Sequence, residues 1–326
     1  MFGMSYYLGF DIGGTKSAAI LGSETSGDIK RVGRAQLPTD LSRKPADFLE
    51  SLFTLADGLL EMNGIPHAGI LGAGISCGGP LDSATGVILS PPNLPGWDSV
   101  PVVEMVRHRF GVKARLQNDA NACALAEWKY GAAKGCRHAV FLTFGTGMGA
   151  GLILNGKLYE GATGLAGEAG HVRLAECGPL GYGKEGSFEG FCSGGGIARL
   201  ARTMASEAMR SGKTVPFAAD GLEQVSAKAV AETAEAGDPL AREIFNICGR
   251  YLGRGLSILM DILNPEIIVI GSIFARSEAL LREAMAEAIN AEALPQTKSA
   301  CRIVPADLGE ALGDMAALAT AAYDNE

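Results

Sequence analysis

Two short glycine turns carry residue types that suit phosphate binding. The first turn, residues 12–16 (IGGTK), follows an apolar run, and the second, residues 144–149 (FGTGMG), follows another. Backbone N–H groups exposed in such turns bind anions, and glycine lets phosphate oxygens approach closely. Thr15 and Thr146 add hydroxyl donors, and Lys16 adds a cation. Asp11 suits a phosphate site once Mg²⁺ or its coordinated waters lie between the two.

Asp119 is a candidate general base. It follows an apolar run and opens a helical segment in the order Asn118-Asp119-Ala120-Asn121. A helix N-cap is the alternative interpretation, because Asp is a favoured capping residue. The chemical interpretation is a carboxylate that accepts the proton of an attacking hydroxyl group while a phosphoryl group is transferred.

A third candidate is the loop Gly167–His171, with Glu189 further along the chain. Glu168, His171 and Glu189 offer directional donors and acceptors of the kind that sugar hydroxyls need. The alternative is an ordinary surface loop, since Glu and His are commonly exposed.

The elements that must position these residues form a repeat. The apolar runs Tyr6–Asp11 and Ser17–Leu21 flank the first turn, and Ala139–Thr143 and Ala150–Leu154 flank the second. Each unit predicts a strand, a glycine turn and a returning strand. The repeat suggests two related lobes that present their turns to a shared cleft, although a coincidence between two hairpins remains the alternative.

Helical spacing predicts helices over most of the remaining chain, and short apolar runs predict further strands. The chain has 326 residues, more than one hydrophobic core normally serves, so two lobes are expected. We therefore predict a mixed α/β fold with two lobes around a central cleft. The predicted N-terminal lobe comprises residues 1–117 with the C-terminal helix 306–326, and the second lobe comprises residues 118–305.

The composition restricts the class of protein. A net charge of −8 and a pI near 5.2 argue against a general nucleic-acid surface. The seven cysteines are scattered without a C-x-x-C pair, which favours a reduced, cytoplasmic protein. We see no signal peptide, and the most apolar C-terminal run is interrupted by polar residues, so we expect no membrane partner.

Several segments together resemble the ROK family of bacterial sugar kinases and repressors. They are LGFDIGGTKSAAIL, SPPNLPGW, NDANACALAE, TFGTGMGAGLILNGKLYEGATGLAGEAGH and LGEALGDMAALATAA. The resemblance implies an actin-like, ribonuclease-H-like ATPase fold in each lobe, ATP and Mg²⁺ as cofactors, and a homodimer.

The resemblance also implies roles for individual residues. Asp119 matches the catalytic base. The positions that match nucleotide-binding motifs are Asp11, Gly13, Gly14, Thr15, Lys16, Thr143, Gly145, Thr146, Gly147, Gly149, Gly271 and Ser272. The positions that match the sugar site are Gly79, Asn93, Asn118, Asp119, Glu168, His171 and Glu189.

One departure from the family concerns zinc. Many members bind structural zinc through the loop histidine and three cysteines, but Leu180, Tyr182 and Ser187 stand at those cysteine positions here. Cys177 and Cys192 lie outside the pattern, so we predict no protein metal site. We expect packing by Leu180, Tyr182 and Phe188 to hold the loop instead.

The sequence thus predicts an ATP-dependent kinase that phosphorylates a small-molecule sugar, with O6 of glucose or a near relative as the expected acceptor. An N-acetylhexosamine, another aldohexose or a glucoside remains open as the substrate. A sugar-sensing regulator is an alternative of another class; we see no room for its DNA-binding domain before the first turn. An actin-like ATPase scaffold is a third alternative.

Overall fold

The computed structural model describes residues 5–323. Its two main sheets share one pattern of strand order, β3-β2-β1-β4-β7 in the first and β10-β9-β8-β13-β14 in the second. In each sheet the strand that leads into a glycine turn, β1 or β8, is the central strand. The repeated strand–turn–strand unit predicted from the sequence therefore occupies equivalent positions in the two sheets.

The strands of the first sheet are β1 (Ser5–Ile12), β2 (Lys16–Thr25), β3 (Asp28–Pro38), β4 (Ile70–Cys77) and β7 (Lys113–Asn118). The first three are antiparallel neighbours, whereas β1, β4 and β7 run parallel. The strands of the second sheet are β8 (Ala139–Leu142), β9 (Ala150–Leu154), β10 (Lys157–Leu158), β13 (Ile267–Ile270) and β14 (Arg302–Pro305). Two-stranded hairpins are formed by β5 (Leu81–Asp82) with β6 (Val87–Ile88) and by β11 (Leu180–Gly181) with β12 (Lys184–Glu185).

The chain divides into two compact units. Unit 1 comprises residues 1–135, 151–166 and 307–326, and unit 2 comprises residues 136–150 and 167–306. The helices of unit 1 are α1 (Pro45–Met62), α2 (Val102–Phe110), α3 (Asp119–Tyr130) and α10 (Leu312–Ala321). Those of unit 2 are α4 (Phe188–Phe191), α5 (Gly194–Arg210), α6 (Ala227–Glu235), α7 (Pro239–Leu263), α8 (Ile273–Glu292) and α9 (Pro295–Ala300). These units place α3 and residues 151–166 with the N-terminal strands, whereas the sequence assigned them to the second lobe.

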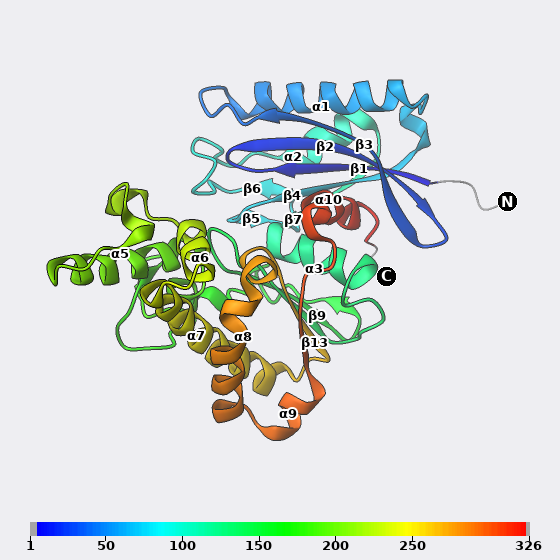
Figure 1. Ribbon diagram of the computed structural model, residues 1–326. Helices are drawn as coiled ribbons and strands as arrows, with labels where there is room; N and C mark the ends of the chain where they lie inside the picture. Colours follow the sequence, from blue (N-terminus) through cyan, green and yellow to red (C-terminus); the bar gives the residue numbers. More distant parts are fainter. Residues whose placement is uncertain (1–4, 324–326) are drawn as a thin grey trace. The chain divides into compact units, whose positions relative to one another are not determined.

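The alternation of residues along β1 explains how unit 1 is layered. Leu8, Phe10 and Ile12 are buried in one core with the apolar faces of α1 and α2. Gly9, on the opposite face, lies against α10, where a Cβ would be only 3.0 Å from the Cβ of Ala317. Helices α1 and α10 therefore cover opposite faces of the sheet (Figure 1). Burial of this apolar surface is the main stabilising term for such a layered unit.

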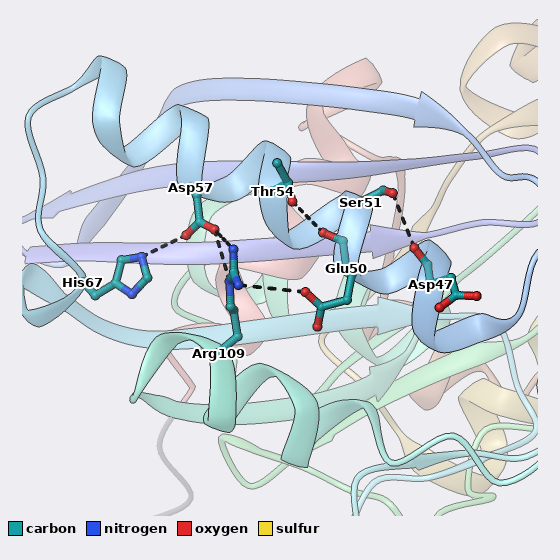
Figure 2. Close-up of polar contacts among 7 residues, drawn as sticks. All are labelled: Asp47, Glu50, Ser51, Thr54, Asp57, His67 and Arg109. Atoms are coloured by element: carbon teal, nitrogen blue, oxygen red, sulfur yellow. Dashed lines mark hydrogen bonds and ion pairs between the residues drawn. The ribbon is translucent and has the colours of Figure 1, made fainter.

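An exposed ion-pair cluster joins α1 to α2 (Figure 2). Arg109 of α2 bonds through Nε to Oδ2 of Asp57 over 3.1 Å, and its Nη1 lies 3.9 Å from a carboxylate oxygen of Glu50. His67 Nε2 lies 2.9 Å from the other oxygen of Asp57. Because Arg109, Glu50 and His67 are exposed to solvent and Asp57 is partly exposed, their pairing contributes little to stability. Within residues 5–323, no helix is both long and apolar enough to cross a membrane.

Candidate active site

The first glycine turn is fixed by bonds to its own ends and to a neighbouring loop. The backbone N–H of Gly13 donates to the carbonyl of Lys16 over 3.2 Å, and the Thr39 hydroxyl donates to the carbonyl of Gly13 over 2.6 Å. The side chains of Thr15 and Lys16 are exposed, so they are free of the turn's internal packing. A fixed backbone with an exposed hydroxyl and ammonium group suits an anion.

Two predicted sugar-site residues lie beside this turn within unit 1. A Cβ at position 14 would clash with the carbonyl oxygen of Asn93, so the turn and the Asn93 loop are in direct backbone contact. A Cβ at Gly78 would lie 3.4 Å from the Asn93 side-chain oxygen, and Gly79 is the next residue. The structure thus brings Gly79 and Asn93 together near the predicted phosphate turn.

Asp119 is the first residue of α3, and the residue before it caps that helix. The side-chain oxygen of Asn118 accepts a hydrogen bond from the backbone N–H of Asn121 over 2.8 Å. The capping interpretation therefore belongs to Asn118 and not to Asp119. The Asp119 carboxylate accepts local backbone bonds, from the N–H of Ala120 to Oδ1 over 2.9 Å and from its own N–H. Its carboxylate is exposed to solvent and available for chemistry.

The parallel strands bring Asp11 and Asp119 to the same edge of the first sheet. Ile12 is paired with Cys77, and Cys77 with Asn118, so β1, β4 and β7 end in register. Burial, the Asp314 carboxylate and then the Asp119 carboxylate raise the pKa of Asp11 to about 6, whereas Arg34 and Lys16 oppose the shift. This edge therefore concentrates negative charge, which a divalent cation would neutralise.

Burial also raises the pKa of Asp119 above its usual range, and the N–H of Ala120 opposes that shift. Solvent reaches the carboxylate, but protein atoms surround it closely enough to disfavour its charged form. A carboxylate with a raised pKa is a stronger proton acceptor, as a general base requires.

The second glycine turn, in unit 2, is closed by its own residues. The N–H of Thr143 donates to the carbonyl of Gly149 over 2.9 Å, and the N–H of Gly149 donates to the Thr143 hydroxyl over 2.8 Å. The Thr143 hydroxyl thus serves the turn itself, whereas the side chain of Thr146 at its tip is exposed.

Two helices begin beside this turn. The N–H of Gly194, at the start of α5, donates to the carbonyl of Gly145 over 2.7 Å. The N–H of Ile273, at the start of α8, donates to the carbonyl of Phe144 over 2.9 Å. Helix N-termini attract anions through their free N–H groups and the helix dipole. Ser272, just before α8, has a φ of 56°, a conformation that is costly for a residue other than glycine and is found most often at functional sites.

A cavity of about 830 Å³ adjoins these helix starts in unit 2. The size suits a nucleotide-sized ligand. Of the predicted residues, Gly145, Thr146 and Ser272 line it. The sequence analysis missed other lining residues: Gly194, Gly195, Ser226, Lys228, Glu232 and Arg276. The sequence did indicate a helix start at Gly194 and Gly195, because a serine, a favoured N-cap, precedes three glycines there. In the structure Ser193 caps α5 by accepting a bond from the N–H of Gly196 over 2.9 Å.

The predicted loop Gly167–His171 packs on the second turn. The N–H of Ala150 donates to the carbonyl of Gly167 over 2.7 Å, and Oε2 of Glu189 accepts a bond from the N–H of Met148 over 3.0 Å. The side chains of Glu168 and His171 are exposed. The predicted site residues therefore form two groups, one in each unit.

The segment 180–188, where the family resemblance led us to look for zinc ligands, is held differently from our prediction. Phe188 is buried as expected, but Leu180 is 46% and Tyr182 is 73% exposed, so packing by these two was a wrong prediction. Hydrogen bonds hold the segment: Arg173 Nη1 donates to the carbonyl of Glu185 over 2.8 Å, and Lys184 Nζ donates to the carbonyl of His171 over 2.8 Å.

The residues around this segment do not fit a zinc ion. Leu180 and Tyr182 offer no thiolate, and Ser187 is buried with its hydroxyl capping α4. Across residues 5–323, no group of three or more His, Cys, Asp or Glu side chains is arranged to hold a metal ion. Structural zinc normally needs four such ligands.

The chain is similar to known proteins over nearly its whole length. The ROK family model matches residues 7–323. A glucokinase from Halalkalibacterium halodurans is 30% identical over 312 residues, which cover 94% of this chain and 92% of that protein. A putative xylose repressor from Caldicellulosiruptor sp. is 32% identical over 239 residues, covering 71% of this chain and 57% of that protein.

A solved structure extends the likeness to the fold. The ROK family glucokinase from Streptomyces griseus, crystallised in complex with glucose and AMPPNP, is 27% identical, with a TM-score of 0.76 and coverage of 98% of this chain and 99% of that one. The fold is the two-lobed, actin-like α/β fold, as the sequence predicted. The chain belongs to the ROK family.

Proposed function

We propose that this protein is an ATP- and Mg²⁺-dependent sugar kinase with Asp119 as its general base. The observation that carries the proposal is the position of Asp119 at the sheet edge that also holds Asp11 and the first glycine turn. Asn118 caps the helix that begins there, so the Asp119 carboxylate is not the cap. Relatives named glucokinase support the same reaction class.

In the proposed reaction, a sugar hydroxyl oxygen attacks the γ-phosphorus of ATP and the Asp119 carboxylate accepts the hydroxyl proton. The bond between the γ-phosphorus and the β–γ bridging oxygen breaks, and ADP leaves with the bonding electrons. Catalysis of phosphoryl transfer depends chiefly on alignment and on neutralising charge. Mg²⁺ bound with ATP would supply part of that neutralisation, and Asp11 is the carboxylate best suited to hold it or its waters.

For the nucleotide we propose the cavity of unit 2 and the turn beside it. The positive ends of the α5 and α8 helix dipoles lie there, and Arg276 adds a cationic side chain, whereas Lys228 lies 3.8 Å from the lining carboxylate of Glu232. These features favour a polyphosphate over an uncharged ligand. We retain the phosphate contacts predicted from the sequence and propose the N–H groups of Thr146 and Gly147 as the central donors, because the N–H of Gly145 already donates to the carbonyl of Gly147 over 3.1 Å.

For the acceptor we propose a hexose, phosphorylated on O6, with glucose or a near relative first. Gly79, Asn93 and Asn118 in unit 1 and Glu168, His171 and Glu189 in unit 2 are the proposed contacts. Because Asn118 uses its side-chain oxygen as a cap, its amide group is the part left for the sugar. An N-acetylhexosamine or a glucoside stays open, since a few hydroxyl contacts decide such a choice.

A regulator is the second candidate function, because the relatives include a putative xylose repressor that is 32% identical. A regulator would bind sugar without catalysing phosphoryl transfer, and an actin-like scaffold would hydrolyse ATP without needing sugar.

We further propose that the protein is cytoplasmic and forms a homodimer. Light scattering on the purified protein would test the dimer.

The test is a coupled ADP-release assay across a sugar panel, run on the wild type, Asp119→Asn and Arg109→Ala. We expect at least one hexose to stimulate ADP release, and Asp119→Asn to lower kcat by roughly 10²-fold or more. Arg109→Ala is the control, because the side chain of Arg109 pairs with Asp57 and Glu50 of α1 and belongs to neither glycine turn nor the start of α3. Sugar binding without any stimulated turnover would favour the regulator and reject the kinase.

A further inference from the structure

Glu189 contacts the second glycine turn directly. Its Oε2 accepts the hydrogen bond from the backbone N–H of Met148 over 3.0 Å, and Met148 lies inside that turn. A Cβ at Gly147 would lie 2.9 Å from the same oxygen. The carboxylate and the turn are therefore in contact at two consecutive residues, and a side chain at position 147 would push them apart.

The proposed sugar loop is fixed to the same turn. A Cβ at Gly167 would clash with the carbonyl oxygen of Ala150, and the N–H of Ala150 donates to the Gly167 carbonyl over 2.7 Å. A Cβ at Gly170 would clash with the carbonyl oxygen of Met148 and would lie 3.3 Å from the Cβ of Glu189. The backbone of the loop Gly167–His171 therefore packs against the backbone at residues 148–150, and the Glu189 side chain packs against the loop.

Helix α4, which carries Glu189, has little freedom to move away. Ser187 caps it by accepting a bond from the N–H of Gly190 over 3.1 Å, and Phe188 is buried. A Cβ at Gly196 in α5 would clash with the carbonyl oxygen of Gly190, so α4 and the start of α5 are also in contact. Helix α5 in turn bonds to the turn through Gly194 and Gly145.

We propose that Glu189 is a positioning residue for the second glycine turn, residues 144–149. Its carboxylate then joins the proposed sugar site, to which the loop Gly167–His171 belongs, to the proposed nucleotide site. This inference rests on the proposed kinase function and deepens it. A carboxylate has about four lone-pair sites, so the bond from Met148 leaves capacity for sugar hydroxyls. Fixing the turn before ATP binds orients the N–H groups of Thr146 and Gly147 and lowers the ordering cost of binding. The coupling between the two ligands is then reciprocal.

The test measures AMPPNP binding in the presence of MgCl₂ and the absence of sugar, by isothermal titration calorimetry. We expect Glu189→Ala to weaken binding about fivefold or more, because one hydrogen bond and the packing around it are lost. Glu189→Gln should rescue affinity to within about threefold, since an amide oxygen still accepts from Met148. Arg109→Ala, which changes an ion-pair cluster between α1 and α2, is the control and should leave AMPPNP binding unchanged. Equal AMPPNP affinity in wild type and Glu189→Ala would overturn the inference.

A second variant tests the same contact by changing the glycine turn and not Glu189. Gly147→Ala places a Cβ against the Glu189 carboxylate, so we expect it to raise the KM for sugar although residue 147 lies in the phosphate turn. An unchanged KM for sugar would count against the link even if Glu189→Ala failed to fold. A wild type that binds no AMPPNP and phosphorylates no sugar would instead reject the proposed function itself.

Discussion

Asn118 and Asp119 divide two tasks at the start of one helix: Asn118 caps α3 by accepting a bond from the N–H of Asn121, and Asp119 keeps its carboxylate exposed. Neighbouring polar residues at this position could each have served as the cap. The division allows the two side chains to be tested separately, because one change should alter stability and the other should alter catalysis.

Asn118→Ala should lower the free energy of unfolding by about 1 kcal/mol, the usual cost of losing a cap. Asp119→Asn should leave it unchanged or raise it slightly, because burial already disfavours the ionised carboxylate in the folded state. Urea denaturation of both variants at pH 7 measures the difference. A large loss of stability in Asp119→Asn would show that Asp119 has a structural task.

Asp11 should make stability depend on pH. Its folded-state pKa is raised from 3.8 to about 6, so the folded protein binds more protons than the unfolded chain between these values. The contribution of Asp11 is most favourable below pH 3.8 and is lost as the pH rises through about 6. Relative to wild type, Asp11→Asn should therefore gain stability as the pH rises from 4 to 7, by up to about 3 kcal/mol.

The comparison uses the difference in unfolding free energy between the two proteins, so that titration of other groups cancels. A difference that stays constant across this pH range would mean that burial and the carboxylates of Asp314 and Asp119 do not raise the pKa of Asp11 in the folded protein.

Glu160 holds a small polar network behind Asp119 in unit 1. Its Oε1 accepts from the Ser83 hydroxyl over 2.7 Å and from Gln117 Nε2 over 2.9 Å, and Gln117 accepts from Asn121 Nδ2 over 3.2 Å. Glu160→Ala should cost about 1–3 kcal/mol of unfolding free energy, because the buried Gln117 amide loses its acceptor.

Glu160→Gln is the matched variant, because its amide oxygen can still accept both bonds. We expect it to cost less than half as much as Glu160→Ala in thermal unfolding. Equal losses in the two variants would mean that the charge of Glu160, and not its hydrogen bonds, supports this part of unit 1.

The segment around Tyr182 should need no zinc. We expect elemental analysis of the purified protein to find far less than one zinc per chain, and a chelator to leave Tm unchanged, because hydrogen bonds from Arg173 and Lys184 hold the segment. Stoichiometric zinc, or a fall in Tm after chelation, would contradict this account.

Much of the fold was predictable because its signals are local. The strand–turn–strand repeat and the strand before Asn118 follow from apolar runs and glycine, and each is present. The cap at Asn118 was harder, since Asn118 and Asp119 have similar capping preferences and only tertiary structure decides between them.

The missed features depend on contacts between distant parts of the chain. Glu189 was predicted as a sugar contact, but its bond to Met148 joins residues 41 positions apart and has no sequence signal. The exposure of Leu180 and Tyr182 was also missed, because apolar type alone does not show that backbone hydrogen bonds can hold a loop. The cavity residues Lys228 and Glu232 lie on α6, and Ser226 caps it; the apolar spacing of this helix predicts only which residues are buried.

The central claim is that Asp119 takes the proton from the sugar, and single-turnover transfer tests it most directly. Enzyme in excess is mixed with γ-labelled ATP and the best sugar of the panel, and labelled sugar phosphate is measured for wild type and Asp119→Asn. We predict that the variant still binds both ligands but transfers phosphate at least about 10²-fold more slowly. Transfer by Asp119→Asn at the wild-type rate would contradict the account.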